Sequence, residues 1–348
     1  MTGSGPGTGL PAGFALPDAA DIDATAVVVS LPMRTRFRGI TAREVMLFRG
    51  PAGWGEFAPF TEYDDTESAA WLAAGIEAAY LGPPPARRDR VPVNATVPAV
   101  PADQVAAILA RYPGATTAKV KVAEPGQSLD DDVARVAAAR AVVPSVRIDA
   151  NGGWSVREAV TAIAAIGEVE YVEQPCRTVD ELARVRRCVD VPIAADESIR
   201  KAGDPLRVVA ADAADIAIVK VAPLGGMRAV LALAERIGLP VVVSSALDSA
   251  VGMAAGVAAA AALPELGLAC GLGTGSLFTV DVAPSFVPVE GSVTPRWFGA
   301  TGSVTGASGA TGDITAGGVE IPGMLRVDAS RERWWRARLA RCHSLLAG

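Results

Sequence analysis

The segments TAKVKV (117–122), VRID (146–149), YVE (171–173) and PIAAD (192–196) decide the fold. Each is a short run of mostly apolar or β-branched residues with a charged residue at or near its end, and alanine-rich stretches of helical character separate the runs. The charged residues Lys121, Asp149, Glu173 and Asp196 follow one another at intervals of 28, 24 and 23 residues. Such even units favour a barrel of alternating strands and helices over a doubly wound sheet.

The pattern continues on both sides of these segments. Four further strands are predicted, at VNATV (93–97), DIAIVK (215–220), PVVVSS (240–245) and LACG (268–271). The glycine run GLGTG (271–275) is not a dinucleotide fingerprint, because it lacks the G-x-G-x-x-G form and no helix follows it. The sequence therefore predicts a (β/α)7β TIM-like barrel over residues 91–298.

Residues before the barrel read as a smaller α+β domain. Strands are predicted between 26 and 57, a helix over 65–81 and a proline-rich linker over 83–92. We expect this capping domain to span 23–90 and to be completed by 319–348, where a helix over 329–346 carries Trp334 and Trp335 as anchors. Residues 1–22 and the Gly/Ser/Thr-rich tract 299–318 are predicted to be flexible.

Composition excludes several classes of function. The chain of 348 residues carries 32 basic and 38 acidic residues, a net charge of −6, which argues against a nucleic-acid-binding surface. Its longest apolar run, 250–263, is too short to span a membrane. The four cysteines have no metal-ligand spacing, so we expect free thiols in a reducing cytoplasm. A single histidine, His343, excludes a three-histidine zinc site. The sequence makes no prediction of the oligomeric state.

Charged residues gather at the predicted strand ends, which form the barrel mouth where active sites lie. Only four of the 32 basic residues are lysines, and three of these four lie at such ends, beside three acids: Lys119, Lys121, Lys220, Asp149, Glu173 and Asp196. Three convergent carboxylates repel one another unless a cation lies among them. Oxygen ligands without histidine or cysteine favour Mg²⁺, with Mn²⁺ as an alternative.

The lysines suggest the chemistry. We expect nearby positive charge to depress their pKa values, so that one of them can act as a neutral base near pH 7. A metal opposite a base is the arrangement needed to remove a proton α to a carboxylate, since the metal stabilises the resulting enediolate. The sequence therefore predicts metal-assisted α-proton abstraction from a small carboxylate substrate.

These residues also carry a family resemblance. Lys119-x-Lys121, Asp149-x-Asn151, Glu173-Gln174-Pro175, Asp196-Glu197-Ser198 and Lys220, with Gly53-Trp54-Gly55-Glu56 in the capping domain, resemble the muconate-lactonizing branch of the enolase superfamily over residues 25–290. Within this branch, RTRFRGITARE, VPVNATVPAV and EYVEQPC look like o-succinylbenzoate synthases of the actinobacterial type, which are lyases of menaquinone biosynthesis.

The resemblance implies a reaction and roles for individual residues. The reaction is dehydration of 2-succinyl-6-hydroxy-2,4-cyclohexadiene-1-carboxylate, with Lys121 as the base and Mg²⁺ on Asp149, Glu173 and Asp196. Lys220 would stabilise the anion from the opposite face, and Lys119 would tune Lys121 and contact the carboxylate. The remaining positions implied to contact substrate or support the site are Arg147, Asn151, Ser245 and the backbone of Gly271; Gly271 is alternatively present for turn geometry alone, and Arg147 is alternatively a charge at the barrel mouth.

Other functions remain open at this stage. An N-acylamino acid racemase or a cycloisomerase on the same scaffold would also use lysines on opposite faces, and this sequence has both. A class I aldolase with Lys220 as a Schiff-base lysine leaves the three carboxylates unexplained. A barrel used only as a binding module does not account for the clustered charges. Loops around 31–39 and 57–61 of the capping domain are expected to close over the barrel mouth.

Overall fold

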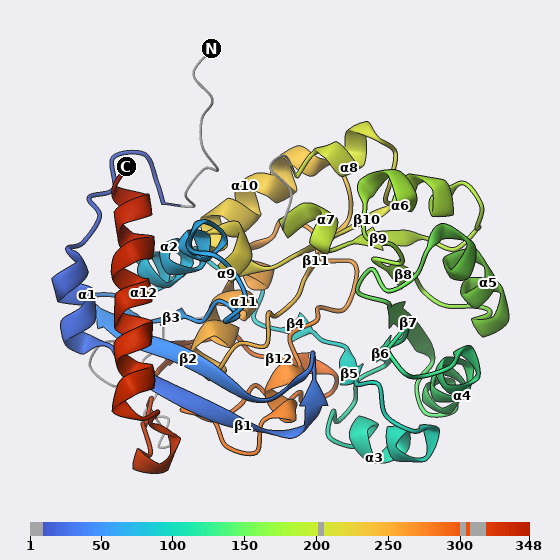
Figure 1. Ribbon diagram of the computed structural model, residues 1–348, viewed down its shortest axis with the longest axis horizontal. Coiled ribbons are helices and arrows are strands. Elements are labelled where there is room, and N and C mark those ends of the chain that lie inside the picture. Colours follow the sequence, from blue (N-terminus) through green and yellow to red (C-terminus); the bar gives the residue numbers. More distant parts are fainter. Residues whose placement is uncertain (1–9, 201–204, 300–303, 307–317) are drawn as a thin grey trace.

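The strands predicted between 93 and 245 form one seven-stranded parallel sheet in the computed structural model, which describes residues 10–200, 205–299, 304–306 and 318–348 (Figure 1). The strand order is β11-β10-β9-β8-β7-β6-β5, so strands adjacent in sequence are adjacent in the sheet. Their bounds are Ala95–Val97 (β5), Thr117–Lys121 (β6), Ser145–Asp149 (β7), Val172–Glu173 (β8), Ile193–Ala195 (β9), Ile216–Val219 (β10) and Val241–Val243 (β11).

The predicted eighth strand, LACG, takes part only through single bridges. Cys270 pairs in parallel with Val93, next to β5, and Gly271 pairs in parallel with Ser244, next to β11. The segment therefore joins the two edges of the seven-stranded sheet and closes the barrel. The predicted (β/α)7β barrel is thus confirmed, with its last strand reduced to two bridging residues.

Helices follow the strands along the chain and cover the outside of the barrel. The longer ones are α4 (Leu129–Arg140), α5 (Val156–Ile166), α6 (Val179–Arg186), α10 (Met227–Ile237) and α11 (Ala250–Ala262), and the short ones are α3 (Val105–Leu109), α7 (Glu197–Arg200), α8 (Arg207–Ala210) and α9 (Val221–Leu224). Each of α4, α5 and α6 begins with a capping box, in which Ser128, Ser155 or Thr178 exchanges hydrogen bonds with an acid three residues later. These caps fix where each strand-to-helix loop ends.

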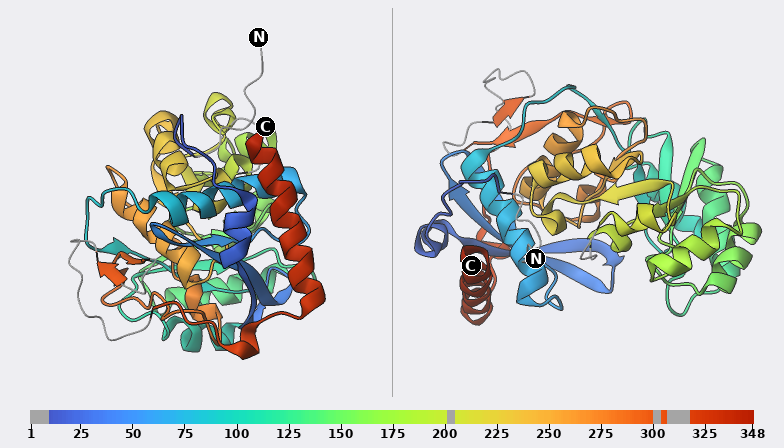
Figure 2. Two further views of the ribbon diagram at one scale, coloured as in Figure 1. Left: turned by 90° about the vertical axis from the view of Figure 1, so that its left-hand side faces the viewer. Right: turned by 90° about the horizontal axis from the view of Figure 1, so that it is seen from above.

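The capping domain is built on a three-stranded antiparallel sheet of β1 (Val27–Phe37), β2 (Ile40–Gly50) and β3 (Gly53–Phe57). Helix α2 (Asp65–Leu81) covers this sheet and has the predicted bounds, with Asp64 as its N-cap. The C-terminal helix α12 (Ala329–Ala347) returns to lie beside α2 and β1 (Figures 1 and 2). Trp335 is fully buried there, with its ring 5.8 Å from that of Phe57. This packing supports the two-domain division, whose boundaries stay a prediction.

Short antiparallel pairings lie at the two ends of the barrel domain. Strand β4 (Val91–Pro92) pairs with β12 (Ser292–Val293), and β13 (Arg296–Phe298) pairs with β14 (Val304–Gly306). Residues 19–22, which we assigned to a flexible leader, instead form part of helix α1 (Ala19–Thr25), because Ile22 is buried in the core. Residues 1–9 and most of the predicted tract 299–318 lie outside the described residues. No helix in the described ranges is long and apolar enough to cross a membrane.

Candidate active site

The charged residues predicted at the strand ends do converge. Parallel pairing sets Lys121 opposite Asp149 and Asp149 opposite Glu173, so three successive strands present their charges at one level. Asp196 directly follows β9 and Lys220 directly follows β10. All six predicted charged side chains therefore lie at the carboxyl ends of β6 to β10, the end of a barrel at which active sites form.

Each carboxylate of this cluster is paired with a lysine. Lys119 Nζ lies 2.9 Å from Glu173 Oε1 and 3.3 Å from Asp149 Oδ2. Lys121 Nζ lies 2.5 Å from the same Asp149 oxygen, which confirms that the two lysines project from one face of β6. Across the site, Lys220 Nζ lies 2.5 Å from Asp196 Oδ2. The cluster therefore consists of three carboxylates and three lysines in two ion-paired groups. Lys119 and Lys121 pair with Asp149 and Glu173, and Lys220 pairs with Asp196.

The carboxylates respond to burial and to these charges in different ways. Burial and the charge of Asp149 raise the pKa of Glu173 to about 7. Burial opposes ionisation of Asp149 as well, but Lys121 and Lys119 outweigh it and hold the pKa of Asp149 far below its usual range. Asp196 behaves like Asp149, since Lys220 and Arg200 lower its pKa despite complete burial. Of the three carboxyl groups, Glu173 therefore takes up a proton most readily.

The two lysines of β6 differ although they are two residues apart. Burial lowers the pKa of Lys121, as expected for a lysine that serves as a base, although Asp149 opposes the shift. Lys119 shifts the other way: burial lowers its pKa, but the charges of Glu173 and Asp149 outweigh burial and raise the pKa above its usual value. Lys119 is therefore held as an ammonium ion, and Lys121 loses its proton more readily.

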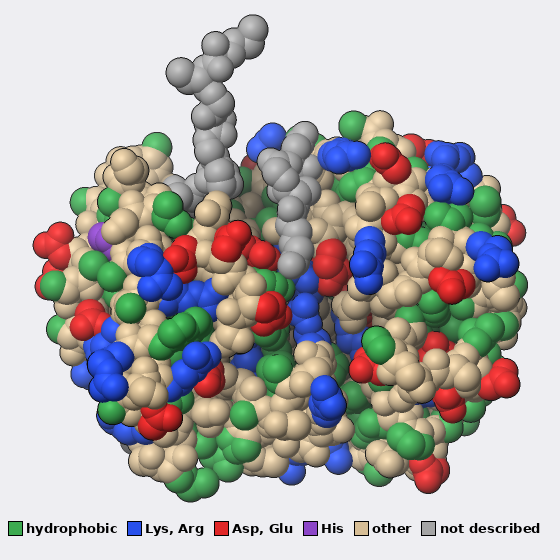
Figure 3. All heavy atoms as spheres, in the orientation of Figure 1, with side chains coloured by type: hydrophobic (Ala, Val, Ile, Leu, Met, Phe, Trp, Pro, Cys, Tyr) green, Lys and Arg blue, Asp and Glu red, His purple; other side chains and the backbone are tan. Residues whose placement is uncertain are grey.

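A cavity opens above this cluster. Its lining includes Lys119, Lys121, Lys220 and Asp149, together with the wall residues Thr96, Asn151, Ser244, Ser245, Ala246, Leu247, Gly271 and Thr274. Phe37 and Arg38, from the turn between β1 and β2, line it from the capping domain. Of the two loops expected to close over the barrel mouth, the one around 31–39 therefore reaches the cavity, whereas 57–61 is not part of its lining; closure itself stays a prediction. Figure 3 shows Lys and Arg side chains at the bottom of the central hollow between the two halves of the molecule.

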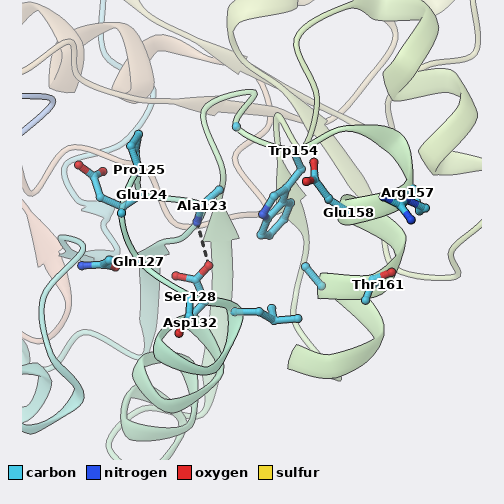
Figure 4. Close-up of a pocket in the computed structure, with 14 residues that line it drawn as sticks. Ala123, Glu124, Pro125, Gln127, Ser128, Asp132, Trp154, Arg157, Glu158 and Thr161 are labelled. Carbon is cyan, nitrogen blue, oxygen red and sulfur yellow. Dashed lines mark hydrogen bonds between the residues drawn. The ribbon is translucent and has the colours of Figure 1, made fainter.

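A second hollow lies between α4 and α5, on the outside of the barrel (Figure 4). Glu124, Trp154, Arg157 and Glu158 are among its lining residues. Within the described residues, its lining contains none of the predicted site residues. The reacting groups therefore belong to the cavity under Phe37 and Arg38.

The family resemblance implied four further positions that contact substrate or support the site. Three of them, Asn151, Ser245 and Gly271, line this cavity. Asn151 Oδ1 accepts a hydrogen bond from Lys121 Nζ at 2.7 Å. Ser245 is buried and hydrogen-bonds to Thr274. Gly271 accepts from the backbone of Ser245 at 3.0 Å. Its φ does not lie in the left-handed region, so turn geometry does not explain this glycine.

Arg147 lies elsewhere. Its guanidinium is fully buried beside the ring of Tyr171 and pairs with Glu170 at 2.6 Å. It also donates to Ala269 O at 2.7 Å and does not line the cavity. Arg147 comes two residues before Asp149 on β7, so its side chain points to the same side but one layer deeper. Direct contact with substrate and a position at the barrel mouth are both wrong for Arg147.

Two residues that sequence reasoning missed support the site. Gln174, next to Glu173, accepts hydrogen bonds from the backbone of Asp196 and Ser198 and so ties the ends of β8 and β9 together. Arg200 donates to Asp196 Oδ1 at 3.1 Å and to the hydroxyl of Tyr63, in the capping domain, at 3.2 Å. The spacing of Arg200 four residues after Asp196, one helical turn, was the available signal.

The donor set fits a hard divalent cation. Asp149, Glu173 and Asp196 supply only carboxylate oxygens, which Mg²⁺ and Mn²⁺ prefer, and all three are buried. In the described part of the chain, however, no three acidic, histidine or cysteine side chains stand ready at metal-binding distances, since lysine ammonium groups lie between the carboxylates. A bound cation would take the place of these ammonium partners.

Gly271 gives a prediction about packing at the cavity wall. A Cβ at this position would lie 2.4 Å from Ser244 Oγ and 3.0 Å from Ser244 Cβ. Gly271→Ala is therefore expected to lower the free energy of unfolding by about 1–2 kcal/mol, as overpacking does, and to lower kcat/KM by displacing the wall. Gly267→Ala is the matched control, because nothing lies within 4 Å of a Cβ there. Urea denaturation checks both; equal stability of the two variants would contradict the steric role.

Comparison with known proteins agrees with this architecture. Residues 28–79 match the family Enolase N-terminal domain-like, and residues 102–299 match Enolase C-terminal domain-like. Among solved structures, muconate lactonizing enzyme from Pseudomonas putida superposes with a TM-score of 0.64 at 22% identity, over 81% of this chain and 96% of that one. This likeness shows the fold.

Proteins found by sequence similarity share a much higher percentage of identical residues with this chain than that structure does. The o-succinylbenzoate synthase of Mycobacterium tuberculosis (strain ATCC 25618 / H37Rv) is 61% identical over 322 residues, which are 92% of this chain and 94% of the relative. The o-succinylbenzoate synthase of Mycobacterium marinum (strain ATCC BAA-535 / M) is 57% identical over 97% of this chain and 98% of the relative. Identity at this level over nearly the whole length of both chains shows the family. The chain is therefore a member of the o-succinylbenzoate synthase family within the enolase superfamily.

Proposed function

We propose that this chain is an o-succinylbenzoate synthase that dehydrates 2-succinyl-6-hydroxy-2,4-cyclohexadiene-1-carboxylate to 2-succinylbenzoate, a lyase reaction of menaquinone biosynthesis. The observation that carries the proposal is the cluster of three lysines ion-paired with three carboxylates at the bottom of a covered cavity. The family membership supports the identity of the reaction.

Lys121 is the base in this proposal. Burial lowers its pKa, and its Nζ lies at the cavity surface between Asp149 and Asn151. The neutral amine removes the proton from the ring carbon that bears the carboxylate, and the electron pair of that C–H bond enters the enediolate. The bond between C6 and its hydroxyl oxygen then breaks, and the proton on Lys121 leaves with the hydroxide as water. The ring becomes aromatic, and no oxidant is needed.

Lys220 and Lys119 stabilise charge. Lys220 reaches the cavity from β10, four strands away from Lys121 on β6, so it faces the reacting carbon from the other side. Its ammonium group lies beside Asp196 and stabilises the anion by electrostatics. Lys119, which lies between Glu173 and Asp149, contacts the substrate carboxylate and tunes Lys121.

Asp149, Glu173 and Asp196 would hold Mg²⁺, or Mn²⁺ in its place. Three buried carboxylates on adjacent strand ends match the oxygen ligands of these ions. When bound, the cation supplies positive charge that stabilises the two negative oxygens developing on the substrate carboxylate. Gln174 and Arg200 keep the ligand-bearing ends of β8 and β9 in place through their hydrogen bonds.

The cavity walls select the substrate. Asn151, Ser245 and the backbone of Gly271 line the barrel side, and Phe37 and Arg38 line the capping side. Cover by the capping domain excludes water, which strengthens the electrostatic stabilisation of the anion. We further propose a cytoplasmic location, which the free state of all four cysteines supports.

A side-by-side assay tests the function. The purified chain with Mg²⁺ is incubated with the cyclohexadiene substrate and, separately, with a single enantiomer of an N-succinylamino acid. The proposal expects kcat/KM for dehydration to exceed that for racemisation. Racemisation without dehydration would overturn it and assign the chain to the racemases that use lysines on both faces.

A further inference from the structure

The segment that follows β11 forms one wall of the substrate cavity and has an unusual conformation. Ser245, Ala246 and Leu247 all line the cavity. Leu247 has a φ of 65°, in the left-handed region that a branched side chain such as leucine rarely adopts. Its amide donates to Ser245 Oγ at 3.2 Å, and its side chain is buried. Such a conformation persists only where the surroundings impose it.

One of the groups that impose it comes from the other domain. Arg43 lies on β2 of the capping sheet and is almost completely buried. Its Nε donates to the carbonyl oxygen of Leu247 at 3.2 Å, and its Nη2 donates to the carbonyl oxygen of Ala58. The guanidinium thus joins the backbone of the capping domain to the backbone of the cavity wall. Because the acceptor is the peptide group of Leu247 itself, the bond fixes the direction of that carbonyl.

Phe60 connects the same guanidinium to the opposite wall. The Arg43 guanidinium lies 4.1 Å from the centre of the Phe60 ring, and the Arg38 guanidinium lies 4.4 Å from the same centre. Arg38 lines the cavity from the capping side. The ring of Phe60 therefore contacts both Arg38, which lines the cavity, and Arg43, which bonds to the barrel wall.

We propose that Arg43 is a positioning residue for substrate binding: through its bond to the carbonyl of Leu247 it holds the wall 245–247 in the shape that fits the substrate. The capping domain would thereby set the shape of the barrel side of the cavity as well as covering it. Arg43 lies outside the lining and touches none of the three lysines. Its loss should therefore change substrate binding and leave the chemical step intact. The expectation that the effect is seen in KM for dehydration rests on the proposed function.

The test is Arg43→Met, measured by steady-state kinetics of dehydration. Of the two hydrogen bonds that the variant loses, only the one to Leu247 O holds the cavity wall, so KM is expected to rise about tenfold, the factor for one hydrogen bond from a charged donor, with kcat unchanged within about threefold. Arg49→Met is the matched control, because Arg49 lies on the same strand but contacts Trp54 and is exposed. A fall in thermal stability with KM unchanged would overturn the proposal, since a merely structural role gives that result.

A double-mutant cycle shows whether Arg43 acts through Leu247. Glycine adopts positive φ without strain, so in the Leu247→Gly background Arg43→Met is expected to raise KM by less than about twofold. The same tenfold rise in both backgrounds would overturn the proposed route. If Arg43→Met does not fold, Arg43→Lys decides: its single ammonium replaces two separate donors, so KM is expected to rise, and an unchanged KM would overturn the proposal.

A crystal structure of Arg43→Met separates this inference from the proposed reaction. We expect Leu247 to leave the left-handed region in the variant, whatever substrate the enzyme takes. Retention of the left-handed φ would overturn the positioning role. Failure of the wild type to dehydrate the substrate would overturn the proposed function instead.

Discussion

Lys121→Ala is expected to lower kcat for dehydration by about 10³–10⁴-fold, the range for loss of a general base and of its contacts to the reacting atoms. The reason is geometric and electrostatic together: Lys121 lines the cavity and has a lowered pKa. Thermal stability should fall as well, because Asp149 stays buried and keeps only Lys119 as a charged partner. Rates of product formation and thermal melting check both points.

Lys121→Arg is the variant that separates a base from a mere positive charge. Arginine keeps the charge and can still pair with Asp149, but its pKa is too high to supply a neutral base near pH 7. The arginine variant should therefore be nearly as inactive as the alanine variant. Activity of Lys121→Arg within tenfold of the wild type would show that Lys121 acts only by its charge, and the proton would have to be taken by another group.

Removal of divalent metal is expected to lower the rate of dehydration by at least about 10²-fold, because the several kcal/mol that a metal contributes to stabilising developing charge amount to that factor or more. Mg²⁺ added back should restore activity.

Glu173→Gln should also prevent Mn²⁺ binding, which calorimetry measures without any substrate. The reason is that Glu173 is one of the three carboxylates that we place around the ion, and the neutral amide of glutamine removes its charge.

The matched control is Glu170→Gln on the same stretch of chain. Glu170 pairs with Arg147, outside the cavity. Its replacement should leave Mn²⁺ affinity unchanged within about threefold, as expected for an acid that is not a ligand. Full activity in chelator, with elemental analysis showing no bound metal, would contradict the metal role of Asp149, Glu173 and Asp196.

The location of the site was predictable because it depends on the arrangement of strands along the chain. Parallel strands place their carboxyl ends at the same level, so the strand ends at Lys121, Asp149 and Glu173 had to meet once the barrel was recognised. The capping sheet and helix α2 followed from equally local patterns. Spacing and local residue preferences were sufficient for these features.

Other features depend on depth and on partners distant in sequence. Arg147 follows the same alternation as Asp149, and alternation alone does not show that its guanidinium turns to Tyr171 and Glu170 and away from the cavity. The raised pKa of Lys119 depends on its distances to two acids, which sequence does not supply. Gly271 is a glycine because Ser244 approaches it across the closing bridge of the barrel.

Contacts between the domains were the hardest to foresee. Arg43 and Leu247 are 204 residues apart, and each looks like an ordinary residue of a strand or a loop. The chain contains 28 arginines, so one more arginine on β2 carried no signal. Only the folded chain shows that this arginine reaches the cavity wall and that Arg200 links Asp196 to Tyr63.

The most direct test of the account is the appearance of the aromatic product. The purified chain, with Mg²⁺ and 2-succinyl-6-hydroxy-2,4-cyclohexadiene-1-carboxylate, is followed by ultraviolet absorbance and by chromatography against authentic 2-succinylbenzoate. The account predicts stoichiometric conversion by the wild type and an initial rate about 10³–10⁴-fold lower for Lys121→Ala. Loss of the substrate without 2-succinylbenzoate, or equal conversion by the two proteins, would contradict it.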